Sequence, residues 1–289
     1  MKAQSLSVVV PNPHCINQCS FCVSGMHESP YKNLLEAGSP DFNLCMQEYL
    51  RRLNFAQQNG CNTVMLTGSS EPQQNKQFLT YFGMFLRMME IPFSWVEMQT
   101  TGVLLNKDYL RFLRSHVNVS LISLSISALN DEKNQAIIHS PMRVCLWDLA
   151  HDIKAEGFSL RLSLNLSEEF EQFTPEQLFT ACKEMGADQV TLRMLYSDGA
   201  NTPQAKWVNE HKLVDVHTAE LYRYIRTYGK PIGRLPYGAV KYSVMGMSVV
   251  LDEDCMGKEE QEADTYKYLI LQPNAKLYSS WDDPASLIF

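Results

Sequence analysis

Residues 5–22, SLSVVVPNPHCINQCSFC, place a short apolar segment directly before three closely spaced cysteines. Residues 5–10 predict a first β-strand that ends at Pro11. Cys15, Cys19 and Cys22 then offer three soft thiolates from one loop, with C-x3-C-x2-C spacing. A structural zinc site takes four ligands, whereas a [4Fe-4S] cluster on three cysteines keeps one iron open for another ligand. The spacing allows four interpretations, which are an open cluster, an electron-carrier cluster, a zinc site and three unrelated buried cysteines.

Length and composition are compatible with a folded protein that has a large core, such as an α/β barrel of one domain. The chain has 289 residues, of which 45% are hydrophobic and 20% charged. It contains no apolar run long enough for a transmembrane helix and does not begin like a secretory signal. We expect a cytoplasmic location, where the other five cysteines are free thiols. These are Cys45, Cys61, Cys145, Cys182 and Cys255. The net charge of −7, without a Lys/Arg cluster, argues against a long nucleic acid as substrate.

Six strands alternate with six helices along most of the chain, which predicts a parallel sheet with right-handed crossovers. The predicted strands are 5–10, 63–67, 93–99, 121–126, 160–166 and 189–194. The predicted helices are 44–58, 77–89, 107–114, 144–155, 175–185 and 214–228. After residue 236 the pattern changes to two antiparallel segments, 241–251 and 266–281, the second with a turn at 272–275. Function is expected at the carboxyl ends of the parallel strands.

The cysteine motif, with Phe21 just before the last cysteine, resembles the signature of the radical S-adenosylmethionine (SAM) superfamily. The resemblance implies a [4Fe-4S] cluster on Cys15, Cys19 and Cys22 whose open iron chelates SAM. It also implies reductive cleavage of SAM to a 5′-deoxyadenosyl radical, which abstracts hydrogen from a small molecule, nucleotide or peptide. An external donor of the flavodoxin or ferredoxin type would supply the electron. The implied fold is a partial (β/α)6 TIM-like barrel over residues 1–235. A C-terminal antiparallel β extension, 236–289, would cover the opening, with a crossed-over seventh strand as the alternative.

The ends of the later predicted strands are similar to further motifs of this superfamily. LTGSSEP at 66–72 resembles its Gly-Gly-Glu segment with serines in place of both glycines, and SLSISA at 123–128 resembles a Ser-Leu-Asp ending. LRMLYSDG at 192–199 is similar to the molybdenum-cofactor-biosynthesis branch, although only Cys255 lies beyond Cys182, so a second cysteine-bound cluster is not expected. The resemblance implies SAM contacts at Phe21, Ser69, Ser70, Glu71, Ser125, Asn165 and Leu195. It implies a substrate contact at Thr100, and we expect Arg161 and Arg193, on the fifth and sixth predicted strands, as further substrate contacts.

Two other classes of function remain as alternatives at this stage. One is a non-catalytic iron-sulfur protein for electron transfer or sensing, which would not bind SAM. The other is a zinc-binding interaction module, which would need a fourth ligand near the cysteine loop. The order of the strand-end motifs favours the SAM enzyme, because neither alternative requires Glu71 or the barrel pattern.

Overall fold

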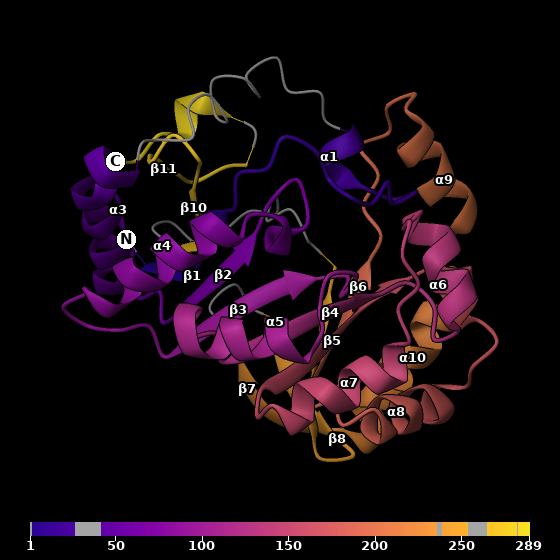
Figure 1. Cartoon of the computed structure of the whole chain (residues 1–289). Coiled ribbons are helices and arrows are strands. Elements are labelled where there is room, and N and C mark those ends of the chain that lie inside the picture. The colour runs from indigo at the N-terminus through magenta and orange to yellow at the C-terminus, as the bar shows by residue number, and fades with distance from the viewer. Residues whose placement is uncertain (1, 27–41, 236–238, 254–264, 282) are drawn as a thin grey trace.

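A computed structural model describes residues 2–26, 42–235, 239–253, 265–281 and 283–289 of the chain. Its strands form one sheet in the order β11-β10-β1-β2-β3-β4-β5-β6-β9-β8-β7 (Figure 1). The strands are β1 Lys2–Val9, β2 Thr63–Thr67, β3 Trp95–Thr100, β4 Leu121–Ile126, β5 Ser159–Leu166, β6 Gln189–Met194, β7 Lys230–Arg234, β8 Val240–Val244, β9 Met247–Asp252, β10 Thr265–Leu271 and β11 Leu277–Tyr278.

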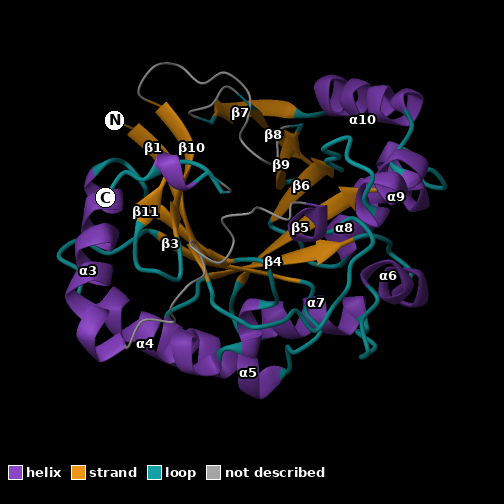
Figure 2. Ribbon diagram, turned by 90° about the horizontal axis from the view of Figure 1, so that it is seen from above, coloured by secondary structure: helices purple, strands orange, loops and turns teal. Residues whose placement is uncertain are grey.

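Most helices cover the outer side of this curved sheet, as Figure 2 shows from above. The helices are α1 Val23–Met26, α3 Phe42–Gln58, α4 Lys76–Arg87, α5 Lys107–Phe112, α6 Asp131–Ile138, α7 Leu146–Ala155, α8 Pro175–Glu184, α9 Pro203–His211 and α10 Asp215–Tyr228. Helices α1 and α9 instead pack against each other beside the cysteine loop. A π-helical turn, Leu113–Val117, follows α5 directly. None of the described helices is both long and apolar enough to cross a membrane. The fold is α/β, with a barrel-like parallel sheet that is not closed.

Alternation along β5 shows how the sequence builds the two faces of the sheet. Leu160, Leu162 and Leu164 lie in the main hydrophobic core beneath the helices. The residues between them are polar and lie on the opposite face, because successive side chains of a strand point to opposite sides. One of these, Arg161, reaches Glu97 on β3 across the inner face of the sheet. The core therefore lies between sheet and helices, and the concave face carries the polar groups.

Local capping signals fix the ends of several helices. Thr174 begins α8 with a capping box, in which its side chain accepts from Gln177 N and the Gln177 side chain accepts from Thr174 N. Thr202 caps α9 in a similar way, with Pro203 at the first helical position. Both caps satisfy backbone N–H groups that a helix start would otherwise leave without partners.

Two strands from the C-terminal part extend the parallel sheet at its two edges. β9 pairs in parallel with β6, and β10 pairs in parallel with β1. The row β10-β1-β2-β3-β4-β5-β6-β9 is therefore parallel throughout. The antiparallel pair β10–β11 with its turn agrees with the predicted segment 266–281, whereas the segment predicted as 241–251 is a hairpin of β8 and β9, and β7 extends it as an unpredicted strand. The alternative of a crossed-over strand is realised as well, because β9 and β10 take the places of a seventh and an eighth barrel strand.

A buried ion pair joins the two edges of this row. Lys267 Nζ on β10 lies 2.8 Å from Asp252 Oδ1 on β9, and the two side chains are only 2% and 7% exposed. β8 pairs with β9 only as far as Val249, and β11 pairs with β10 only from Ile270. The two charges therefore meet where β8 no longer pairs with β9 and β11 does not yet pair with β10. Strand tilt in a barrel produces this kind of stagger between the edges.

The differences between prediction and structure are additional elements and additional strand pairings. All six predicted barrel strands and helices are present, with ends that differ by a few residues. Helices α1, α6 and α9 and strand β7 were not predicted, and neither were the parallel pairings of β9 and β10. The boundary at residue 235 stays a prediction, because one sheet contains strands from both sides of it.

Candidate functional site

The cysteine loop leaves the carboxyl end of β1 and ends at α1. Cys15, Cys19 and Cys22 are free thiols of intermediate exposure, and Cys22 N donates to Cys19 O at 3.0 Å. Burial raises the pKa of the Cys19 thiol, and the nearby charges of Cys22 and Cys15 add to this. Burial also raises the pKa of Cys15, while hydrogen bonds from the backbone of Asn17 and Glu71 oppose that shift. The three thiols therefore lie close enough to affect one another electrostatically.

This set of donors fits an iron-sulfur cluster by its chemistry. Thiolates are soft ligands that bind such clusters. Among the described residues, no three His, Cys, Asp or Glu side chains are arranged to hold a metal ion. A cubane cluster does not need its ligands around one ion, because each cysteine binds a different iron. Of the remaining cysteines, Cys61 and Cys182 are buried free thiols and Cys145 is an exposed one, and the side chains of Cys45 and Cys255 lie outside the described residues.

Residues that follow β2 hold the first half of the cysteine loop. Asn12 Nδ2 donates to Ser70 Oγ at 2.8 Å. The Gln74 side chain accepts from Ile16 N at 2.9 Å and donates to His14 O at 2.9 Å. These bonds bring the predicted Ser-Ser-Glu segment next to the predicted metal ligands, although the two are more than 50 residues apart in sequence.

Glu71 is the centre of a buried hydrogen-bond network between β2, β3 and the loop. Its Oε1 accepts from Thr101 N at 2.9 Å, Thr101 Oγ1 at 2.6 Å and Asn17 Nδ2 at 3.3 Å, and its Oε2 accepts from Thr100 Oγ1 at 2.8 Å. Burial raises the pKa of this carboxyl, and the hydrogen bonds from Thr101 and Thr100 partly offset that shift. A carboxylate offers about four acceptor positions, two on each oxygen, and the internal donors of Glu71 place three bonds on Oε1 and one on Oε2.

The second half of the loop is held by the end of α6. Gln18 N donates to Ile138 O at 3.1 Å, and Ser20 N donates to Ile137 O at 2.9 Å. The Ser20 hydroxyl lies 3.0 Å from Nε2 of His139, the residue that ends the helix in a left-handed conformation with φ of 46°. Because α6 was not predicted, its role in placing the loop could not be predicted either.

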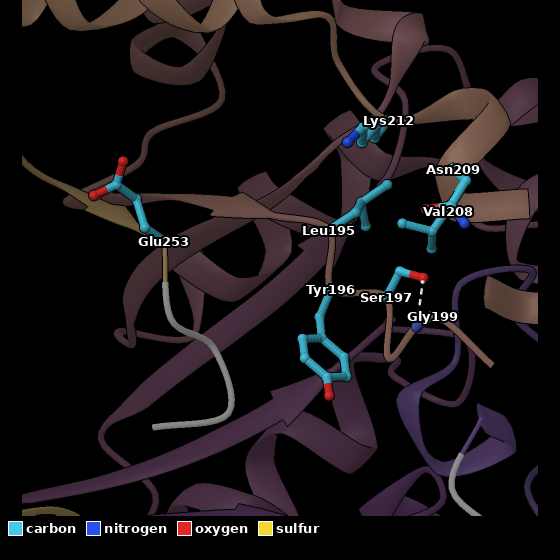
Figure 3. Close-up of a pocket in the computed structure, with 8 residues that line it drawn as sticks. All are labelled: Leu195, Tyr196, Ser197, Gly199, Val208, Asn209, Lys212 and Glu253. Carbon is cyan, nitrogen blue, oxygen red and sulfur yellow. Dashed lines mark hydrogen bonds between the residues drawn. The ribbon is translucent and has the colours of Figure 1, made fainter. Parts of the chain in front are cut away.

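A pocket of about 390 Å³ lies beyond the end of β6, against α9 (Figure 3). It is lined by Leu195, Tyr196, Ser197, Gly199, Val208, Asn209, Lys212 and Glu253. Phe21 packs in the same small hydrophobic cluster as Leu195, Val208 and Met26. The ring of Phe21 lies 6.0 Å from that of Trp207 on α9. The structure therefore brings Phe21 and Leu195 together, with the unpredicted helix α9 as the connecting wall.

The other predicted SAM contacts lie elsewhere on the strand ends. Asn165 Nδ2 donates to Ser127 Oγ at 3.2 Å and to Ser125 Oγ at 3.5 Å, so Ser125 and Asn165 are neighbours on β4 and β5. Ser69 lines a different cavity of about 380 Å³, which it shares with Asn12 beside β1. These two groups and the Leu195 pocket all lie at the carboxyl ends of parallel strands.

The three predicted substrate contacts are engaged with protein partners. Arg161 lies 2.6 Å from Glu97 Oε2 and also donates twice to Gln189 Oε1. Arg193 Nε lies 3.8 Å from Asp252 Oδ2. The hydroxyl of Thr100 is bound to Glu71, as described above. A substrate role for Arg161 would require its buried ion pair to open, since Glu97 is 1% exposed.

The signals that would have identified the missed residues were partly present in the sequence. Thr202-Pro203 has the same helix-start pattern as Thr174-Pro175, which begins the predicted helix 175–185. Asn130, followed by two acidic residues, marks the start of α6. Gln74 carries no such signal, because a glutamine near a strand end has no preferred function.

The fold is similar to that of several solved structures. Native anSMEcpe with bound S-adenosylmethionine aligns with a TM-score of 0.60 and 11% identity, over 98% of this chain and 77% of that one. The same protein with bound S-adenosylmethionine and the Kp18Cys peptide gives a TM-score of 0.57 and 12% identity, over 96% and 74% of the two chains. Coproporphyrinogen III oxidase (HemN) from Escherichia coli, a radical SAM enzyme, gives 0.53 and 14%, over 79% and 54%.

These likenesses concern the fold. The chain spans 55% and 60% of two further anSMEcpe structures and 54% of HemN, which is less than two thirds of their lengths. No family model and no curated protein matches the sequence. At identities of 11–14% the shared feature is the parallel barrel with its helices.

Proposed function

We propose that this protein is a radical SAM enzyme. Cys15, Cys19 and Cys22 would hold a [4Fe-4S] cluster, with SAM at the open iron. The observation that supports this most directly is the position of the three free cysteines, in one loop at the carboxyl end of the first barrel strand. When bound, the cluster supplies one electron that cleaves SAM to methionine and a 5′-deoxyadenosyl radical. The radical would then abstract a hydrogen atom from the substrate.

The protein residues would bind and orient SAM along the rim of the barrel. Phe21 and Leu195 line one apolar region with Val208, which suits the flat face of an adenine. Asn165 and Ser125 offer an amide and a hydroxyl for the polar groups of SAM. The backbone at Ser69 and Ser70 would approach its amino group, since small side chains leave the peptide accessible.

Glu71 has a different proposed role from the one that the motif implied. Glu71 is 4% exposed and accepts four internal hydrogen bonds, so we propose that it positions the loop and the end of β3 instead of binding the SAM ammonium directly. Thr100 and Thr101 belong to the same network. In this role the Glu71 side chain lies beside the cysteine loop and does not contact the ligand.

The substrate class is proposed only broadly. A small molecule, a nucleotide or a peptide would reach the carboxyl ends of the strands, and the bound peptide in one similar structure makes a peptide a reasonable first choice. An external electron donor of the flavodoxin or ferredoxin type would reduce the cluster. Neither partner is needed to test the initiation chemistry.

The decisive experiment is anaerobic reconstitution with iron and sulfide, followed by reduction with dithionite in the presence of SAM. Release of 5′-deoxyadenosine, measured by liquid chromatography, is the expected result. Cys19→Ala should lose both the cluster and the product, whereas Cys145→Ala, a change at an exposed cysteine outside the loop, should keep both. An intact cluster without SAM cleavage would point instead to an electron-transfer or sensor protein. A colourless protein that binds zinc would point to an interaction module.

A further inference from the structure

The Gln74 side chain bridges the two peptide groups on either side of Cys15. Its Oε1 accepts from Ile16 N and its Nε2 donates to His14 O, both at 2.9 Å. A single amide thus makes the same pair of bonds that a neighbouring β-strand would make. The side chain is exposed, so it gives up rotamer freedom to hold this position. No motif singled out Gln74 in the sequence.

Gln74 is itself held firmly by the structure around it. It ends a short 3₁₀ turn, Pro72–Gln74, and its backbone N donates to Glu71 O at 3.1 Å. The next residue, Asn75, caps α4 and donates from its side chain to Pro11 O at 2.6 Å. The buried Glu71 network and the start of α4 therefore fix both ends of the segment that carries Gln74.

The two halves of the cysteine loop depend on different supports. The Cys19–Cys22 half is held by the α6 carbonyls and by its own turn. The peptide groups next to Cys15 take their side-chain partner from Gln74. We propose that Gln74 is a positioning residue that holds Cys15 ready to bind its iron, an inference that rests on the proposed function.

A neutral amide suits this position better than a charged group. The loop must hold three thiolates and a cluster that accepts an electron, so a carboxylate here would add repulsion. An amide also supplies both a donor and an acceptor, which a carboxylate cannot do. Gln74→Glu would place an oxygen against His14 O and break one of the two bonds, although its size is unchanged.

The first test uses the protein without its cluster. Hydrogen exchange at the Ile16 amide should rise roughly tenfold in Gln74→Ala and in Gln74→Glu, because each change weakens the bridge over Cys15. Exchange at Gln18 and Ser20 should stay unchanged, since α6 carbonyls hold those amides. Gln77→Ala is the matched control, because Gln77 is an exposed glutamine three residues further on, at the start of α4. Circular dichroism establishes that each variant is folded.

The second test uses the reconstituted protein. Gln74→Ala and Gln74→Glu should release iron to a chelator roughly tenfold faster than the wild type, and the midpoint potential should rise as water reaches the cluster. Gln77→Ala should match the wild type in both measurements. Wild-type exchange and iron release in both Gln74 variants would overturn the role of Gln74 and leave the proposed function intact. Absence of a cluster in the wild type would overturn the proposed function instead, and the exchange result would show whether the bridge exists.

Discussion

Removing the charge of Asp252 should destabilise the protein far more than removing the charge of an exposed carboxylate. Asp252 and Lys267 lie on opposite edges of the parallel sheet, 2.8 Å apart, and both are almost fully buried. In Asp252→Asn the ammonium of Lys267 would face a neutral amide in a place that water barely reaches. Lys267→Met is less severe, because Arg193 lies 3.8 Å from the remaining carboxylate and is itself 32% exposed.

The geometry sets the size of the effect. Two unit charges 2.8 Å apart attract by about 6 kcal/mol at an effective dielectric constant of about 20. Much of that attraction offsets the cost of removing both ions from water, but a single substitution loses the attraction and keeps the desolvation cost. We therefore expect Asp252→Asn to lower the free energy of unfolding by about 3–5 kcal/mol. For Lys267→Met we expect about 2 kcal/mol, the usual scale for a hydrogen bond to a charged group.

The assay is urea unfolding followed by far-ultraviolet circular dichroism, on both single variants and the double variant. The double variant should lose less than the sum of the single losses, since neither partner is then left alone. Lys107→Met is the control, because Lys107 pairs with Asp152 at 3.2 Å while 58% exposed, and exposed pairs contribute at most about 1 kcal/mol. A loss below about 1 kcal/mol in Asp252→Asn, or additive losses in the double variant, would refute the reasoning.

Three further predictions concern packing, thiol chemistry and capping. Gly83→Ala should lower the free energy of unfolding in urea by about 2 kcal/mol, because the added methyl would lie 2.0 Å from a backbone oxygen of the π-helical turn. Gly233→Ala is the control and should leave it unchanged, because a methyl there meets nothing within 4 Å. Burial raises the pKa of Cys61 to about 12. Alkylation at pH about 8 should therefore modify the exposed Cys145 and leave Cys61 unmodified until the protein unfolds. Labelling of Cys61 in the folded protein should increase as the pH rises, because the reactive thiolate becomes more populated. Thr174→Ala should lower stability by about 1 kcal/mol, measured by thermal unfolding, since it removes the capping box of α8.

Each of these predictions has an outcome that would contradict it. Equal stability of the Gly83 and Gly233 variants would mean that α4 can move away from the π-helical turn at little cost. Rapid labelling of Cys61 in the folded protein would show that its core opens readily. An unchanged melting temperature in the Thr174 variant would show that solvent replaces the lost cap without a penalty.

The sequence predicted the elements whose signals lie within one segment. Residues 63–67, 121–126 and 189–194 have the same bounds in the structure as in the prediction. Helix α9 was missed because its buried side chains, Ala205 and Val208, pack on the cysteine loop and α1 region and not on the sheet. Such a helix needs only a short apolar contact, so it lacks the long apolar stripe that identifies a helix in sequence.

The hydrogen bonds that connect the candidate site residues could not be predicted from the sequence. The motif resemblance implied a SAM contact at Glu71, which stays a prediction, and in the structure Glu71 accepts a hydrogen bond from Asn17 in the cysteine loop. A carboxylate can bind a ligand or satisfy several internal donors, and the sequence does not distinguish these uses. Only the folded chain shows that Thr100, Thr101 and Asn17 donate to it. The sequence also could not show that Arg161 forms an ion pair with Glu97, because Glu97 lies on another strand.

The sequence by itself determined the three-cysteine loop, the six barrel strands with six of the helices, and the start of α8. These depend on periodicity, spacing and turn chemistry, which involve neighbours along the chain. The tertiary structure alone decided that β9 and β10 join opposite edges of the sheet and that Lys267 and Asp252 meet between them. It also decided that Gln74 supports Cys15. The physical reason is that pairing between distant segments depends on the stagger and closure of the whole barrel, which no local pattern encodes.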